Sequence, residues 1–196
     1  MGIGGLGKTT LAKVVYNDLR VKDHFAVKAW YYLGDRYDIC SVLKSVIESI
    51  TDENWKRGND LQDLQKGLGE AISQRRMLLV LDDYASIDSQ FEDKLKSALC
   101  SSSGSGSCIL LTSRSIPVTS EFSTPQPYHL RSLNEDDAWE MFSRRAFSNG
   151  QERPEFVALG RDIVKICKGL PLAVKVMSGL MRTKTTLADW ETVTKG

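Results

Sequence analysis

Long hydrophobic segments and a marked excess of one charge are both absent from this sequence of 196 residues. No apolar run approaches the roughly 18 residues that a membrane-spanning helix needs. The 26 basic and 25 acidic side chains leave a net charge of +1, which gives no reason to expect a nucleic-acid or membrane partner. No signal peptide precedes the first glycines, and we therefore expect a cytoplasmic protein.

Clusters of metal-binding residues are absent as well. The four cysteines are widely scattered and form no C-x-x-C pair, and we interpret them as small buried hydrophobic residues in a reducing compartment. His24 and His129 lack a cysteine or a second histidine at ligand spacing, so we expect structural or surface roles for both. The sequence therefore predicts no zinc-type site.

The hydrophobic pattern divides the chain into two predicted domains. Hydrophobic residues make up 41% of the chain and charged residues 26%, which are the proportions of a globular protein. In residues 1–131, short apolar runs alternate with amphipathic stretches, as in an α/β domain with a parallel sheet. In residues 132–196 the strands stop, and acidic residues after Asn134 are typical of a helix N-terminus. We therefore predict an α/β domain followed by a helical domain.

The spacing of hydrophobic residues also predicts the individual elements. Strands are expected over residues 26–33, 77–81, 108–111 and 128–130. Helices are expected over residues 9–19, 39–50, 61–74, 91–99, 134–147, 156–167 and 171–181. Trp190 opens a further element that the sequence does not complete.

A glycine-rich segment at the start of the sequence fits a phosphate-binding pattern. Residues 2–9, GIGGLGKT, match G-x-x-x-x-G-K-[ST] at every fixed position. Glycines allow successive backbone N–H groups to turn around phosphate oxygens, and the loop leads into a helix N-terminus that favours an anion. We expect Lys8 to reach the β- and γ-phosphates and the Thr9 hydroxyl to bind Mg²⁺. The phosphate-binding residues predicted in this way are Gly4, Gly5, Leu6, Gly7, Lys8, Thr9 and Thr10.

Two aspartates follow a buried strand at residues 78–83, LLVLDD. Ligands of doubly wound sheets lie at the carboxyl ends of the strands, where these carboxylates are expected. We assign Asp82 to the Mg²⁺ site, directly or through water, and Asp83 to the orientation of the attacking water. The alternative is that both aspartates only cap a loop after a core strand.

A second strand ends in polar residues at 108–114, CILLTSR. An arginine at this place is suited to contact the γ-phosphate and to report its presence, and we assign that role to Arg114. The alternative is an ordinary exposed arginine. The turn at residues 168–173, KGLPLA, is a helix junction, and nothing local assigns a ligand to it.

These elements, in this order, resemble the NB-ARC nucleotide-binding module of plant disease-resistance receptors, the nucleotide-binding, leucine-rich-repeat class. The resemblance covers nearly the whole chain. The quoted P-loop, the LLVLDD strand and the arginine-bearing strand match three of its motifs. YHLRSLNEDDAWEMFSRRAF and CKGLPLA resemble the motifs of its helical ARC1 subdomain, and the Ala29-Trp30 pair is typical of the coiled-coil subclass.

The resemblance implies an ADP/ATP switch in plant innate immunity. ADP would hold an inactive state, exchange for ATP would permit activation and oligomerisation, and hydrolysis by an at most slow ATPase of the P-loop (STAND) class would reset the switch. Lys8 and Thr9 would bind phosphate and Mg²⁺, and Arg114 would sense the γ-phosphate. Pro171 would pack against the nucleotide from the helical subdomain. The implied partners are the coiled-coil, winged-helix and leucine-rich-repeat domains of the same receptor.

The strand that normally leads into the P-loop is missing from the sequence, and so is the winged-helix region that normally follows. We therefore interpret the chain as a partial sequence. Loss of a central strand removes about four buried side chains, at roughly 1.5–3 kcal/mol each, from a domain whose stability is typically about 5–15 kcal/mol. We predict that the chain folds poorly and binds nucleotide weakly, which a cooperative melt with micromolar ADP affinity would contradict.

Other nucleotide-binding classes fit the sequence less well. An N-K-x-D guanine motif, an L-S-G-G-Q-like transporter signature and an arginine-rich kinase lid are not found. A signalling scaffold with a vestigial nucleotide site remains the alternative function. A related signalling ATPase from outside plants is also compatible with the chemistry, although the Ala29-Trp30 pair favours plants.

Overall fold

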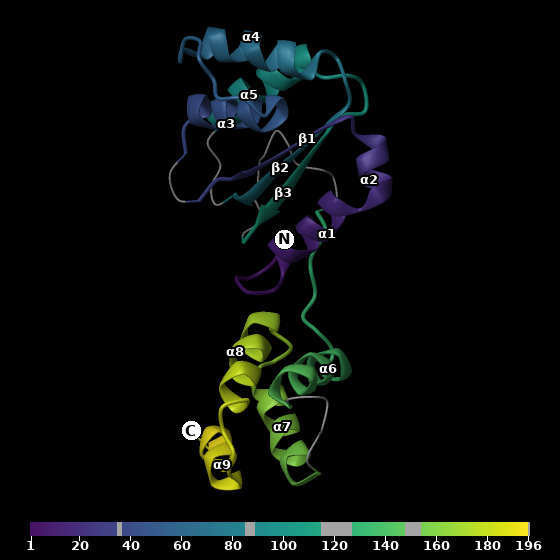
Figure 1. Cartoon of the computed structure of the whole chain (residues 1–196), viewed down its shortest axis with the longest axis vertical. Coiled ribbons are helices and arrows are strands. Elements are labelled where there is room, and N and C mark those ends of the chain that lie inside the picture. The colour runs from purple at the N-terminus through teal and green to yellow at the C-terminus, as the bar shows by residue number, and fades with distance from the viewer. Residues whose placement is uncertain (35–36, 85–88, 115–126, 148–153, 196) are drawn as a thin grey trace. The chain divides into compact units, whose positions relative to one another are not determined.

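The computed structural model describes residues 1–34, 37–84, 89–114, 127–147 and 154–195. These residues form two compact units (Figure 1). The first unit contains residues 1–2 and 8–129, and the second contains residues 3–7 and 130–196. The predicted domain limits, 1–131 and 132–196, stay predictions.

A parallel three-stranded sheet forms the centre of the first unit. Its strands are β1 (Val27–Tyr32), β2 (Met77–Tyr84) and β3 (Cys108–Ser113), in the order β1-β2-β3. Residues 77–82 of β2 are all buried, as expected of a strand that is covered on both faces. Because the strands are parallel, their carboxyl ends share one edge of the sheet. Asp82 and Asp83, two of the predicted site residues, lie at that edge.

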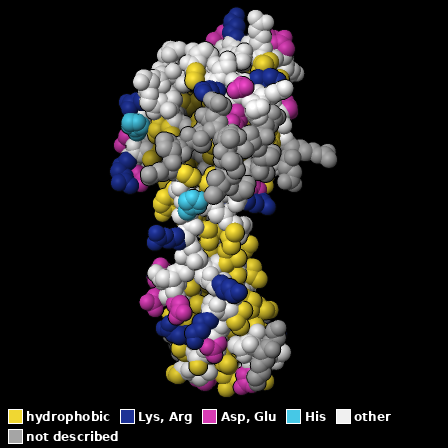
Figure 2. Space-filling model, turned by 180° about the vertical axis from the view of Figure 1, so that it is seen from behind, with side chains coloured by type: hydrophobic (Ala, Val, Ile, Leu, Met, Phe, Trp, Pro, Cys, Tyr) yellow, Lys and Arg dark blue, Asp and Glu magenta, His cyan; other side chains and the backbone are white. Residues whose placement is uncertain are grey.

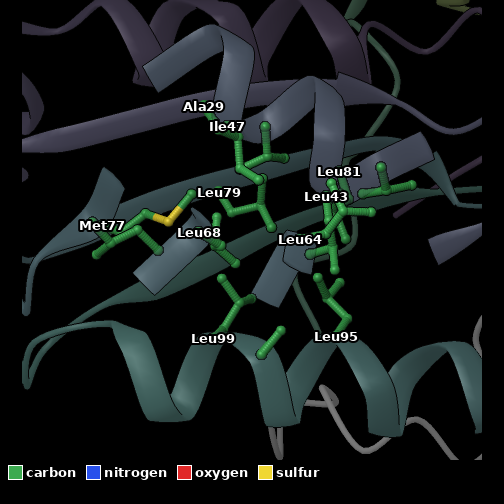
Figure 3. Close-up of a cluster of buried hydrophobic side chains, with 14 of the residues drawn as sticks. Ala29, Leu43, Ile47, Leu64, Leu68, Met77, Leu79, Leu81, Leu95 and Leu99 are labelled. Atoms are coloured by element: carbon green, nitrogen blue, oxygen red, sulfur yellow. The ribbon is translucent and has the colours of Figure 1, made fainter. Parts of the chain in front are cut away.

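Helices cover both faces of this sheet (Figure 1). They are α1 (Lys8–Asn17), α2 (Leu19–His24), α3 (Ile39–Thr51), α4 (Leu61–Ile72) and α5 (Ser89–Ser102). The larger core lies between β1, β2 and the helices α3, α4 and α5, where Leu79 packs among side chains such as Leu68 and Leu95 (Figure 3). On the other face, Ala12 of α1 packs against Leu78 and Val80. Alternate residues of β2 therefore contribute to two opposite cores.

The second unit is helical apart from its loops, in the part of the chain that the structure describes. Its helices are α6 (Glu135–Ala146), α7 (Pro154–Ile166), α8 (Pro171–Met181) and α9 (Leu187–Lys195). Asn134 caps α6, because its side chain accepts a hydrogen bond from the Asp137 N–H. Trp190 of α9 is 2% exposed and stacks on Phe147 in the core of this unit. The element that Trp190 was expected to open is thus a helix that completes this core.

Hydrophobic side chains also lie at the surface of the second unit (Figure 2). On α8, Leu172, Val176 and Leu180 recur every four residues and are exposed, while Val174 and Met181 of the same helix are buried. Helical spacing therefore gives α8 a buried apolar face and an exposed apolar face.

The predicted α/β class is confirmed, and some predicted elements need correction. The strand expected over residues 128–130 is wrong: these residues form no ladder, and Tyr128 is exposed. A short apolar run alone does not make a strand without a neighbour to pair with. The sequence also missed α2, whose six residues begin after the cap Asp18. Two of the four cysteines, Cys100 and Cys108, are exposed rather than buried.

Candidate functional site

Two glycines of the glycine-rich loop adopt left-handed backbone conformations, and the first residue of the loop is hydrogen-bonded to β3. Gly5 and Gly7 have φ angles of 76° and 96°, a region that side-chain-bearing residues rarely adopt. The Gly2 N–H donates to the Ser113 carbonyl at 3.2 Å, which attaches the start of the loop to the end of β3. In the second unit, the Gly5 carbonyl accepts a hydrogen bond from the Leu172 N–H at 3.1 Å. The glycines at these positions are therefore required by backbone conformation.

Lys8, the first residue of α1, contacts the first glycine of the phosphate-binding pattern. Its Nζ donates to the Gly2 carbonyl at 2.6 Å. Partial burial lowers the pKa of Lys8, and the nearby Arg114 lowers this pKa as well, while Asp83 and Asp82 raise it. The electrostatic coupling indicates that this ammonium group lies near the polar ends of β2 and β3.

Asp82 is buried at the end of β2 and joins three elements. Its Oδ1 accepts hydrogen bonds from Thr9 Oγ1 of α1 at 2.9 Å and from Thr112 Oγ1 of β3 at 2.5 Å. Asp82 is 3% exposed, and the two hydroxyl groups supply hydrogen bonds to a carboxylate oxygen of this buried residue. The two predicted Mg²⁺ ligands, Thr9 and Asp82, are thus placed side by side.

Asp83 adopts an unusual backbone conformation. Its φ angle is 63°, and the register between β2 and β3 shifts between Leu81 and Tyr84. A shift of this kind re-aims a side chain at the end of a strand. The Asp83 N–H donates to Thr112 Oγ1 at 3.0 Å, so the Thr112 hydroxyl contacts both aspartates.

The Asp83 carboxylate is held by an arginine and a tyrosine. Arg114 Nε donates to Oδ1 at 2.9 Å, and Arg114 Nη2 donates to Oδ2 at 2.6 Å. The Tyr32 hydroxyl donates to the same Oδ2 at 3.2 Å. The hydrogen bonds from Arg114 are the main reason that the pKa of Asp83 lies below its usual value, and Tyr32 and Lys8 contribute in the same direction.

The structure therefore brings five of the predicted site residues to one edge of the sheet. These are Lys8, Thr9, Asp82, Asp83 and Arg114. Thr10 is exposed on the first turn of α1, and Leu6 is buried. Pro171 is the first residue of α8 in the second unit, so its contact with a nucleotide stays a prediction.

Sequence reasoning missed two residues of this edge, Tyr32 and Thr112. Tyr32 ends β1 and lies in register with Asp82, and Thr112 is the second-last residue of β3. A signal was present, because the carboxyl ends of parallel strands meet at one edge. Choosing the residues required the register between strands that are about 30 and 50 positions apart, which the sequence does not provide.

Among the residues that the structure describes, no group of three or more His, Cys, Asp or Glu side chains is placed to hold a metal ion. None of the described helices is long and apolar enough to cross a bilayer.

The chain matches a known protein family and is similar to several plant proteins. The model of the NB-ARC domain matches residues 1–152. Disease resistance protein RGA2 of Solanum bulbocastanum is 41% identical over 98% of the chain, which spans 20% of that protein. Putative disease resistance RPP13-like protein 1 of Arabidopsis thaliana is 35% identical over 98% of the chain, which spans 18% of it. The chain thus spans about a fifth of the length of these relatives.

Proposed function

Because this chain belongs to the NB-ARC family, we propose that it is the ADP/ATP-binding switch module of a plant defence receptor. ADP holds the inactive state in this proposal, exchange for ATP permits activation, and slow hydrolysis resets the switch. The observation that carries the proposal is the convergence of Lys8, Thr9, Asp82, Asp83 and Arg114 at one sheet edge.

The glycine-rich loop is the proposed phosphate cradle. Lys8 Nζ contacts the Gly2 carbonyl at 2.6 Å, so the ammonium group lies beside the first glycine of the phosphate-binding pattern. Partial burial of Lys8 strengthens its attraction for an anion, because the ammonium group gives up water contacts in advance. The N-terminus of α1 adds backbone N–H groups and a favourable dipole.

The Thr9–Asp82 pair fits a magnesium ion. Oxygen ligands of Mg²⁺ lie about 2.0–2.1 Å from the ion in octahedral geometry, which places neighbouring ligands about 2.9–3.0 Å apart. Thr9 Oγ1 and Asp82 Oδ1 are 2.9 Å apart, and both are hard oxygen donors. Mg²⁺ typically takes one or two protein ligands and completes its shell with phosphate and water. When bound, the ion would neutralise phosphate charge.

Asp83 and Arg114 are the proposed residues of hydrolysis and sensing. Arg114 carries five N–H donors and suits bidentate contact with phosphate as well as with carboxylate. In this structure Arg114 is engaged by Asp83. A γ-phosphate would compete for the guanidinium group, and the released Asp83 carboxylate would then orient the attacking water. Pro171 is proposed to pack against the nucleotide, and the partners are proposed to be further domains of the same cytoplasmic receptor.

Nucleotide binding tests the proposal. We measure the affinities for ADP and ATP, with Mg²⁺, by calorimetry in the chain and in a version extended upstream. Lys8→Arg is expected to weaken binding about tenfold or more, because a guanidinium group does not reproduce the compact ammonium contact. Lys13→Arg is the matched control, since Lys13 is an exposed lysine on the same helix. Equal binding by Lys8→Arg and wild type, or no binding in both versions, would favour the scaffold alternative.

A further inference from the structure

Tyr32 occupies a defined position at the end of β1. It pairs in register with Asp82 of β2, and the next residue, Leu33, donates its N–H to the Asp82 carbonyl at 2.9 Å. This pairing carries the end of β1 to the level of the two aspartates. The Tyr32 hydroxyl then reaches Asp83 Oδ2 at 3.2 Å.

The turn after β1 fits closely against the Tyr32 ring. Gly34 has a φ angle of 60°, and a Cβ built on it would lie 3.1 Å from Cε1 of Tyr32. A side chain at position 34 would therefore press against the ring as well as adopt a strained backbone. The turn and the ring limit each other's position.

Burial does not account for a tyrosine at position 32. The residue is 60% exposed, whereas Tyr31, one position earlier, packs against the larger core of the first unit. A residue that contributes little to the core and contacts a carboxylate of the site is better explained by that contact.

The two oxygens of the Asp83 carboxylate are contacted differently. Arg114 donates to both oxygens, whereas the described tyrosine contact is to Oδ2 alone. If Arg114 turns to a γ-phosphate, Oδ1 loses its hydrogen bond from Nε, while Oδ2 keeps the hydrogen bond from Tyr32. The carboxylate then stays oriented, and Oδ1 becomes available to a water molecule.

We propose that Tyr32 is a positioning residue for Asp83 in ATP hydrolysis, an inference that rests on the proposed function. The water oxygen bonds to the γ-phosphorus, the bond from that phosphorus to the bridging oxygen breaks, and ADP leaves with the electron pair. The water is held by Asp83 Oδ1, and its proton leaves with the inorganic phosphate. Tyr32 acts through Asp83 and holds Oδ2 throughout.

Single-turnover ATP hydrolysis tests the role of Tyr32. Tyr32→Phe removes only the hydroxyl group, and we expect the hydrolysis rate constant to fall about tenfold, equivalent to about 1.4 kcal/mol of transition-state stabilisation. The dissociation constants for ADP and ATP are expected to stay within about twofold, because Tyr32 has no role in phosphate binding here. Tyr31→Phe is the matched control, since it removes the same group from the neighbouring position and is expected to leave the rate unchanged.

A double-mutant comparison separates positioning from a general structural effect. In an Asp83→Asn background the rate is already low, and Tyr32→Phe is expected to lower it no further. An equal rate for Tyr32→Phe and Tyr31→Phe, or an additive effect in the Asp83→Asn background, would overturn the role of Tyr32. If wild type neither binds nucleotide nor hydrolyses ATP, both in the chain and in the version extended upstream, the proposed function itself would be overturned.

Discussion

The two ends of strand β2 differ in kind although they belong to one strand. From Met77 to Leu81 every residue is buried, and the backbone keeps a regular register with β1 and β3. At Asp82 and Asp83 the register with β3 shifts, and the side chains are carboxylates. Hydrophobic burial therefore determines the position of the strand. Polar contacts from α1, β1 and the end of β3 determine how the two carboxylates at its end are oriented.

The site end of β2 also holds strain that the core end lacks. A left-handed conformation costs a residue other than glycine roughly 1–2 kcal/mol, although aspartate tolerates it better than most. Such a conformation persists where several contacts determine it together. Asp83 has these contacts in Thr112, Arg114 and Tyr32. The residues that hold the strain are therefore also those that aim the carboxylate.

The largest expected effect is at the core end of β2. Leu79 is 1% exposed and lies in the centre of the larger core (Figure 3). We expect Leu79→Ala to lower the free energy of unfolding by about 2–5 kcal/mol, because it removes buried contacts and leaves a cavity. Urea unfolding followed by circular dichroism measures this change.

The matched control for Leu79 is Leu19→Ala on α2, where the leucine is 73% exposed. This substitution is expected to change the free energy of unfolding by no more than about 0.5 kcal/mol. Equal losses in the two variants would mean that the core around β2 is not the main source of stability in the first unit.

A smaller effect is expected at the site end of β2, from Thr112→Val. Valine has nearly the same shape but lacks the hydroxyl group that contacts Asp82 Oδ1 and the Asp83 N–H. Two polar groups at the end of the strand lose a partner, and we expect a loss of about 1–3 kcal/mol in the free energy of unfolding. We also expect weaker Mg²⁺-dependent ADP binding, because the Asp82 carboxylate loses a fixed contact and the Asp83 backbone N–H loses its acceptor.

Thr112→Ser keeps the hydroxyl group and provides the control. It is expected to retain most of the Mg²⁺-dependent ADP affinity that Thr112→Val loses. If serine and valine reduce the affinity equally, packing of the threonine methyl group, rather than its hydrogen bonds, determines the geometry of the carboxylates.

The core end of β2 was predictable from the sequence, and the site end was predictable in part. Five consecutive apolar residues from Met77 to Leu81 indicate a strand covered on both faces, and the P-loop pattern is local. The pattern also identified Asp82 and Asp83, because both aspartates follow that strand directly. Asp82 lies beside Thr9 and Asp83 beside Arg114, while the chemical roles of these residues stay predictions.

The missed features depend on contacts between distant segments. Thr112 and Tyr32 meet the aspartates through strand register, and the φ angle of Asp83 follows from a shift in that register. Neither is encoded in a short window of sequence. The wrong strand at residues 128–130 has the opposite cause: an apolar pattern was present, but none of the strands that the structure describes pairs with it.

The smallest effect on stability is expected at Asp38, a polar residue that caps a helix and does not belong to the candidate site. Asp38 precedes α3, which packs on the larger core, and its carboxylate accepts hydrogen bonds from the Ser41 N–H and hydroxyl group. The hydrogen bonds from Ser41 hold the pKa of Asp38 below its usual value. At neutral pH we expect Asp38→Ala to cost about 1 kcal/mol of unfolding free energy, as for other helix caps, without changing ADP affinity.

The pH dependence of Asp38 follows from the direction of its pKa shift. Because its pKa is lower in the folded chain, its contribution is complete above the unfolded value of about 3.9 and is lost as the pH falls through the folded pKa. Asp38→Asn keeps a cap that does not titrate. Between about pH 5 and pH 2, wild type should therefore lose more stability than Asp38→Asn in urea unfolding. Identical pH profiles would mean that the charge of the Asp38 carboxylate does not stabilise α3.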